Sequence, residues 1–349
     1  MTKDEKIAKL GKEITDRATV LLGKDKITPD APEYLGINSA LKFTAVKYDE
    51  KMADDILDIA LTMKKRVPLT IEQLAKKNPQ FDRAYLEKAM QAISESGLVE
   101  FHWENLDGKN PNHEKRWVLD MFVPGSAEIM MINPEQADMF PETADFFERM
   151  AYLPLAGITE MVPPGGAGIG MHVIPVEKAI PAESKSLPIE HLSHWLKKYE
   201  GHIGVSVCSC RKQQRIRGEA PATWKASGAS RRDFADYCRE TNHGHDITYE
   251  EAMEILQKAE DRGYVHQITN IDGENKIFGI CNCAVGVCNA LAHQPAVQHA
   301  EPVRLRLRGR ERPGKVRCLR QVRRDLPGWC CPPRSEALHE GRPHPVSAP

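Results

Sequence analysis

Five cysteines of this 349-residue chain fall into two tight groups that could bind a metal. The first group lies in GVSVCSCRKQQRIRGE and the second in KIFGICNCAVGVCNAL. The five residues are Cys208, Cys210, Cys281, Cys283 and Cys288. Thiolates are ligands of both zinc and iron–sulfur centres, so this pattern predicts a site of one of these two kinds.

The spacing within each group supports a shared centre. Alternate residues of an extended chain point to the same side, with Cα atoms roughly 6.5 Å apart. The pairs Cys208–Cys210 and Cys281–Cys283 each follow a strand-like run and would each present two sulfurs. That geometry makes a disulfide within a pair difficult and suits two ligands of one centre. Cys238 in FADYCRE is a further candidate ligand, although a lone buried cysteine usually only packs as a small apolar side chain.

Basic side chains follow the first pair closely, at Arg211, Lys212, Arg215 and Arg217. Because thiolate-bound iron–sulfur clusters are anionic, this charge favours iron–sulfur over zinc. Four thiolates also suit zinc, so a zinc-stabilised interaction module stays an alternative. No side-chain pattern indicates acid–base or nucleophilic chemistry, and we predict no catalytic residue. The nearby histidines are interpreted as surface or packing residues, at His191, His194 and His202.

The elements around the cysteines predict an α+β fold. Strand-like runs precede both pairs, and ITYEEAMEILQKAEDRGYVHQ between them predicts a helix. The apolar face of this helix would carry Ala252, Ile255, Leu256 and Ala259. Residues 191–291 are therefore predicted to form a cysteine-rich α+β domain.

A winged-helix-like module is predicted over residues 51–125. The segment ADDILDIALTMKK predicts a helix whose apolar face carries Ile56, Ile59, Ala60 and Met63. Thr70 and Gln73 form a capping-box pattern, Asp82 is an N-cap candidate, and Gly97 marks the end of a helix. Two strand-like runs, VEFHWE and KRWVLDMFVPG, then flank a turn-rich segment.

The charges of this module do not favour DNA binding. Residues 51–125 carry 11 basic and 12 acidic side chains, and phosphate neutralisation supplies most non-specific affinity for DNA. Arg83 and Lys88 on the candidate recognition helix are offset by Asp82, Glu87 and Glu95. We expect a packing or docking role, with a redox- or metal-responsive DNA-binding regulator as the alternative.

The remaining segments carry fewer signals. Residues 1–50 are interpreted as a charged helical lead-in, and residues 126–190 as a connector that contains the strand-like MHVIPV. No apolar run approaches the length of a membrane span, and the N-terminus is charged rather than signal-like. We therefore expect a cytoplasmic protein with reduced cysteines.

The cysteine segments and the helix between them resemble the N-terminal region of a family of anaerobe iron–sulfur oxidoreductases, of the 4Fe-4S ferredoxin-type and pyridine nucleotide-disulfide (FAD-dependent) kind. The resemblance covers roughly residues 50–291. It implies that Cys208, Cys210, Cys281 and Cys283 ligate a 4Fe-4S cluster. In that family a ferredoxin motif, C-x2-C-x2-C-x3-C-P, follows the cysteine-rich region, and some members continue into a flavin- and pyridine-nucleotide-dependent domain. This motif is absent after Leu291.

The composition changes at Ala292. Residues 1–291 carry 36 Lys and Arg against 44 Asp and Glu, a net charge of −8, whereas residues 292–349 carry 12 against 5, a net charge of +7. The later segment contains 11 Arg but a single Lys, and it has no Ile, Phe, Tyr, Met, Asn or Thr. It is predicted to be an irregular, disordered tail. Its arginines and its cysteines, Cys318, Cys330 and Cys331, are not interpreted as a nucleic-acid or metal site.

Back-translation offers a reason for this change. A Cys codon arises one base out of frame wherever a codon ending in TG, for Leu or Val, precedes one beginning with C or T. Such positions stand at Val316, Leu319, Val322 and Leu326, with the spacing of the missing ferredoxin motif. We hypothesise that residues 292–349 are the out-of-frame translation of a ferredoxin domain.

Together these observations predict an iron–sulfur electron-transfer protein, the N-terminal part of a ferredoxin-linked oxidoreductase. Its partner would be a redox protein or a flavoprotein domain. FAD or NAD(P) would enter only through such a downstream domain or partner.

The reading-frame hypothesis predicts a specific gene sequence. The frame one base over from about Ala292 should be open and should hold four Cys codons followed by a Pro codon, at spacings of 3, 3 and 4 codons, as at Val316, Leu319, Val322 and Leu326. Sequencing the encoding DNA checks this directly. A stop codon within that frame, or the absence of the four Cys codons, would contradict the hypothesis.

Overall fold

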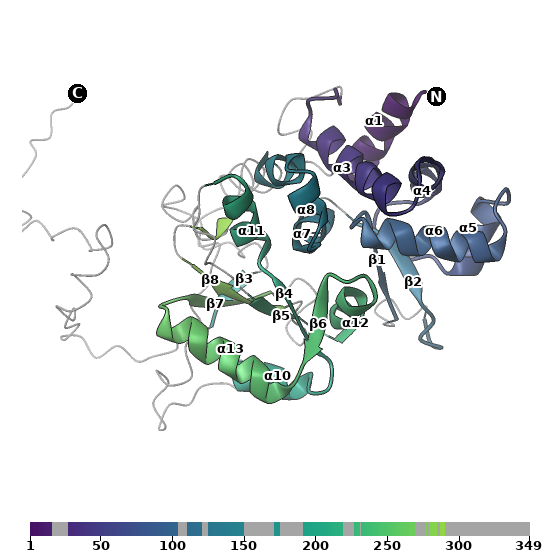
Figure 1. Ribbon diagram of the computed structural model, residues 1–349. Helices are drawn as coiled ribbons and strands as arrows, with labels where there is room; N and C mark the ends of the chain where they lie inside the picture. The colour runs from purple at the N-terminus through teal and green to yellow at the C-terminus, as the bar shows by residue number, and fades with distance from the viewer. Residues whose placement is uncertain are drawn as a thin grey trace, which may run out of the picture. The chain divides into compact units, whose positions relative to one another are not determined.

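The computed structural model describes residues 1–15, 27–103, 110–120, 125–149, 171–174, 191–218, 227–230, 232–269, 277, 279–284 and 287–289. Helices and strands are mixed along these residues, in agreement with the predicted α+β class (Figure 1). The predicted tail, residues 292–349, lies outside the described part of the chain. Among the described helices, none is both long and apolar enough to cross a membrane.

Three N-terminal helices pack together: α1 (Lys3–Ile14), α3 (Pro32–Lys47) and α4 (Glu50–Thr62). Ile7, Leu10 and Ile37 are completely buried in their shared core. The predicted lead-in is therefore an integral part of the module that follows it. α3 buries residues around much of its circumference, so it lacks the polar face that marks a packed helix in a sequence.

The elements predicted for residues 51–125 occur in the expected order. α4 is followed by α5 (Ile71–Lys77), α6 (Arg83–Glu95), β1 (Val99–His102) and β2 (Arg116–Leu119). The capping box joins Thr70 and Gln73, and Asp82 accepts a hydrogen bond from the Tyr85 amide, as predicted. Gly97 ends α6 with φ of +78°. β1 and β2 pair in antiparallel fashion. The chain before α5 also pairs with β2, through isolated bridges at Lys65–Leu119 and Leu69–Trp117.

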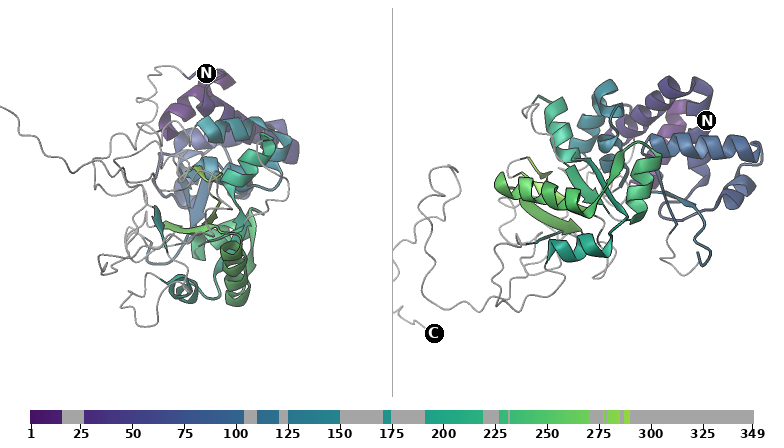
Figure 2. Two further views of the ribbon diagram at one scale, coloured as in Figure 1. Left: turned by 90° about the vertical axis from the view of Figure 1, so that its left-hand side faces the viewer. Right: turned by 60° about the horizontal axis from the view of Figure 1, so that its bottom comes forward.

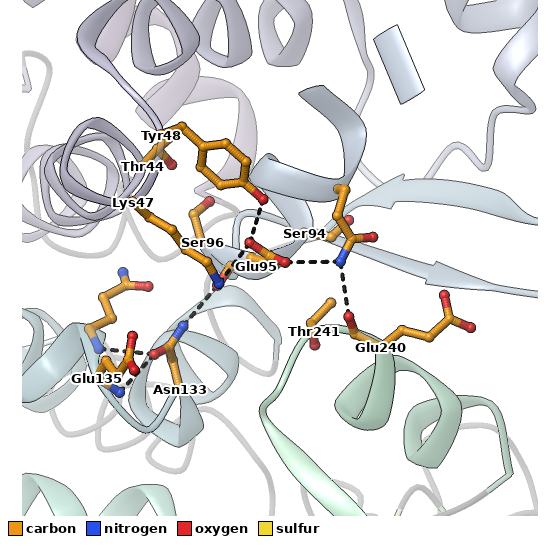
Figure 3. Close-up of polar contacts among 12 residues, drawn as sticks. Thr44, Lys47, Tyr48, Ser94, Glu95, Ser96, Asn133, Glu135, Glu240 and Thr241 are labelled. Atoms are coloured by element: carbon orange, nitrogen blue, oxygen red, sulfur yellow. Dashed lines mark hydrogen bonds and ion pairs between the residues drawn. The ribbon is translucent and has the colours of Figure 1, made fainter. Parts of the chain in front are cut away.

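The segment predicted as a connector also contributes to this core. α7 (Ala127–Ile132) buries Ile129, Met130 and Met131, and α8 (Gln136–Met139) follows it. Figure 3 shows the polar contacts that tie α3, α6 and this segment together. Glu95 accepts a hydrogen bond from Tyr48 Oη at 2.7 Å and forms an ion pair with Lys47. Asn133 Nδ2 donates to the Glu95 carbonyl at 2.9 Å.

A six-stranded antiparallel sheet forms the second part of the fold, in the order β3-β7-β8-β5-β4-β6. Its strands are β3 (Met171–Val173), β4 (Ile203–Val207), β5 (Ser227–Ser230), β6 (Gly244–Ile247), β7 (Val265–Thr269) and β8 (Gly279–Cys283). α10 (Leu192–Lys198) and α13 (Tyr249–Asp261) lie side by side on one face (Figures 1 and 2). Trp195 and Leu256 from these helices pack with Ile268 and Ile280 of the sheet.

α12 (Arg232–Glu240) joins the two parts of the fold. Tyr237 is completely buried, its ring lies edge-on to Phe101 of β1 at 5.0 Å, and its hydroxyl donates to the Ser94 carbonyl at 2.5 Å. The segments predicted as separate domains, 51–125 and 191–291, thus share buried contacts within the described residues.

Two glycines with positive φ, Gly97 and Gly263, allow the packing of α7 against Gly97 to be tested. A Cβ at Gly97 would lie 2.9 Å from the Met130 backbone nitrogen, whereas a Cβ at Gly263, with φ of +72°, would have nothing within 4 Å. Gly263→Ala should lower the free energy of unfolding by about 1 kcal/mol through backbone strain alone. Gly97→Ala should cost about 1–3 kcal/mol more through the added overlap. Urea unfolding of both variants measures this difference, and equal losses would contradict the packing of α7 against Gly97.

Candidate metal centre

The sheet topology brings both cysteine pairs to one edge. β4 and β8 each pair with β5 in antiparallel fashion, so they run in the same direction and end on the same side. Val207 pairs with Ser227, and Ile280 pairs with Ala229. When these two registers are extended, Cys208 and Cys283 stand at the same level. Their strands are two strand spacings apart, or about 9–10 Å.

Cys281 and Cys283 point away from the helix-covered face of the sheet. In the β7–β8 pair, Ile268 is opposite Ile280, and both belong to the core under α10 and α13. Side chains alternate between faces along a strand, so Cys281 and Cys283 lie on the other face. Val265 and Gln267 lie opposite these two cysteines and share their face.

The first pair differs from the sequence expectation. Cys208 follows β4 directly, but it is the N-cap of α11 (Ser209–Ile216), and Cys210 lies in the first turn of this helix. The prediction of an extended backbone is therefore correct for Cys281–Cys283 and wrong for Cys208–Cys210. A helix N-terminus favours a thiolate because its backbone amides carry partial positive charge.

Cys288 lies close to the end of β8 and to α11. The Cys288 amide donates to the Ala284 carbonyl at 3.1 Å. Asn289 Nδ2 lies 3.5 Å from Gln213 Oε1 of α11. Cys288 is thereby held between the two C-x-C pairs.

The five predicted thiols interact with one another. Cys210 donates a hydrogen bond to Cys208, and this bond is the largest cause that lowers the pKa of Cys208, with a further lowering from the amide and guanidinium of Arg211. Cys210 also bonds with Cys288, and the two bonds together with burial raise the pKa of Cys210. The pKa of Cys283 is likewise raised by hydrogen bonds with Cys281 and Cys288. Cys288 therefore connects both pairs.

The contacts among the thiols do not by themselves form the coordination geometry of a metal ion. Among the residues that the structure describes, no group of three or more His, Cys, Asp or Glu is arranged to hold a metal ion. The six described cysteines are thiols rather than disulfides. Since metal ligands must lose their protons, the shared protons of this cluster would be released when a metal binds.

Cys238 has different surroundings from the other five. It is 1% exposed on α12 and belongs to the core that contains Tyr237 and Phe234. Burial raises its pKa, and the nearby charges that contribute are Glu100 and Asp246 rather than another cysteine. The structure thus gives Cys238 the packing role that a lone buried cysteine usually has.

Of the four basic residues after the first pair, only Arg211 is directed at the thiols. Arg215 pairs with Asp138 at 2.7 Å, and Arg217 pairs with Asp145 at 2.9 Å. Lys212 Nζ donates to the Asn133 carbonyl and lies 3.5 Å from Asp138, while burial lowers its pKa. The electrostatic argument from the sequence therefore depends on one side chain instead of four.

Arg211 also connects the two cysteine segments. It is 3% exposed, its Nη2 donates to the Asn282 carbonyl at 2.5 Å, and its guanidinium lies 4.3 Å from the centre of the Tyr264 ring. The Asn282 side chain in turn bonds with His266 Nδ1 at 2.8 Å on the opposite face of the sheet. The residue between Cys281 and Cys283 is thus fixed through both its backbone and its side chain.

Sequence reasoning missed Gln267, Asn282 and His266 as parts of this site. Asn282 lies between two candidate ligands, so the sequence alone could have identified it as a neighbour of both. His266 and Gln267 are identified only by the pairing of β7 with β8, which a single sequence does not give.

The comparisons with known proteins found no match: no family model, no curated protein and no solved structure is similar to this chain.

The contacts of Arg211 predict that two substitutions on α11 have unequal effects. Arg211→Gln should lower the free energy of unfolding by about 1.5–3 kcal/mol, because a buried charged hydrogen bond is lost, and it should raise the pKa of Cys208. Arg215→Gln, which removes an exposed ion pair, should cost less than about 1 kcal/mol and leave that pKa unchanged. Denaturant titration and the pH dependence of Cys208 alkylation in metal-free protein measure both effects. Equal alkylation profiles for the two variants would show that Arg211 does not act on Cys208.

Proposed function

We propose that this chain is an iron–sulfur electron-transfer protein, the N-terminal part of a ferredoxin-linked oxidoreductase. The observation that carries the proposal is the convergence of five thiols at one sheet edge, with Cys288 bonded to both C-x-C pairs. When bound there, an iron–sulfur cluster would supply one-electron transfer. The ligands would be drawn from these five residues: Cys208, Cys210, Cys281, Cys283 and Cys288.

The chain's own residues would hold and tune such a group. Arg211 places a buried positive charge beside Cys208, which offsets the negative charge of thiolate ligands. Cys283 and Cys288 are buried, which limits the access of water to their sulfurs. Two elements, α11 and β8, position the pairs, so the sulfur positions are set by regular structure rather than by long loops.

A zinc-stabilised interaction module is the second candidate. Structural zinc sites are closed by four ligands, and any four of these thiols satisfy that number. The buried guanidinium of Arg211 beside Cys208 favours an anionic iron–sulfur group instead.

The segment from α4 to β2 is proposed to be a winged-helix-like packing module. The cations on its candidate recognition helix have partners, which disfavours the DNA-binding alternative. Arg83 forms ion pairs with Glu72 at 2.8 Å and Glu87 at 3.0 Å. Lys88 lies over the Tyr48 ring at 5.8 Å. Phosphate binding would have to compete with these contacts.

Anaerobic purification followed by iron, sulfide and zinc analysis tests the proposal. The wild-type protein should be coloured and should hold iron and acid-labile sulfide. Cys288→Ala should lose most of both, because Cys288 connects the two pairs.

Cys238→Ala is the matched control, since Cys238 is equally buried but lies in another core. It should keep the iron and sulfide of the wild type. A colourless wild-type protein that holds zinc and no sulfide would overturn the iron–sulfur proposal and favour the zinc module.

A further inference from the structure

A buried glutamine lies next to the proposed ligands and has no hydrogen-bond partner among the described residues. Gln267 of β7 is 0% exposed, and both Nε2 and Oε1 lack a partner within the described structure. Most buried amides are hydrogen-bonded, because an unpaired polar group in the interior costs free energy. Since no described residue pairs with it, this amide is available to bond with a group held by the neighbouring cysteines.

The sheet register directs this side chain toward the cysteines. Gln267 is directly opposite Cys281 in the β7–β8 pair. Residues opposite each other in an antiparallel pair share a face, with Cβ atoms about 4.5–5.5 Å apart. Cys283 is two residues further along β8 and lies on the same face. Gln267 is thus placed beside two of the five thiols.

We infer that the Gln267 amide donates an N–H···S hydrogen bond to the sulfur of a cluster bound at Cys281 and Cys283, and so raises the reduction potential of that cluster. This inference rests on the proposed iron–sulfur function. Hydrogen bonds to cluster sulfurs stabilise the reduced, more negative state and are a principal control of the potential. An apolar residue at this position would fill the space but would offer no donor.

The surroundings support a donor role rather than a purely structural one. The neighbour of Gln267 on the other face, His266, bonds through Nδ1 with Asn282. The Val265 side chain, two residues earlier on the cysteine face, is apolar. Gln267 is therefore the amide that β7 presents to the pair Cys281–Cys283.

The test compares anaerobically purified wild-type protein with Gln267→Met and Gln267→Leu. Met has a similar length and Leu a similar branched shape, and neither side chain has a hydrogen-bond donor. Gln136→Met is the matched control, because Gln136 of α8 is also 0% exposed with an unpartnered Oε1 but contacts Ser39 and Asn133 instead of the sheet. Iron and sulfide content, midpoint potential and pulsed-EPR deuterium coupling after exchange into D2O are measured for each.

Both Gln267 variants should keep the iron and sulfide of the wild type but shift its potential in the negative direction. A tenfold fall in the ratio of reduced to oxidised cluster corresponds to about 59 mV for one electron. Both should also lose an exchangeable deuterium coupling that the wild type and Gln136→Met retain. Unchanged potentials and couplings in loaded Gln267 variants would overturn the role of Gln267 alone. A wild-type protein without iron and sulfide would instead overturn the function on which the inference rests.

Discussion

The pairing of both β4 and β8 with β5 is the constraint on which the site depends. Two antiparallel pairings to one strand make β4 and β8 parallel, so their ends meet at the same edge of the sheet. Cys208 then follows one strand while Cys283 ends the other. Residues more than 70 positions apart in the sequence come within two strand spacings, about 9–10 Å. A one-residue slip in this register would move the cysteines of β8 to the helix-covered face.

Once the pairs share an edge, short-range interactions complete the cluster. Hydrogen bonds connect Cys288 with both pairs, and the buried Arg211 fixes the backbone between Cys281 and Cys283. In the absence of a metal, the sulfurs share protons, which lowers the pKa of Cys208 and raises that of Cys210. A metal centre would replace those shared protons with coordination bonds, so site formation and folding of this edge should be coupled.

The sequence predicted the local elements well and the long-range arrangement only in part. The caps at Thr70 and Asp82 and the end of α6 at Gly97 are encoded by a few adjacent residues, and they were confirmed. The integration of α1 and α3 into the core was missed, because α3 is apolar on several sides.

In the site, the two cysteine pairs were recognisable from their spacing, but the helical position of Cys210 and the separate location of Cys238 were not. These depend on where strands end and on which segments pack together. The pairing of the basic residues after Cys210 with Asp138 and Asp145 is equally a tertiary feature.

Iron K-edge X-ray absorption on anaerobically purified protein tests the central claim most directly, because it reports the neighbours of each metal atom. The account predicts a shell of about four sulfur neighbours for each iron, accompanied by an iron–iron scattering shell. Both shells should be lost when Cys288 is replaced by Ala. Iron without an iron neighbour, or a protein in which zinc is the bound metal, would contradict the account.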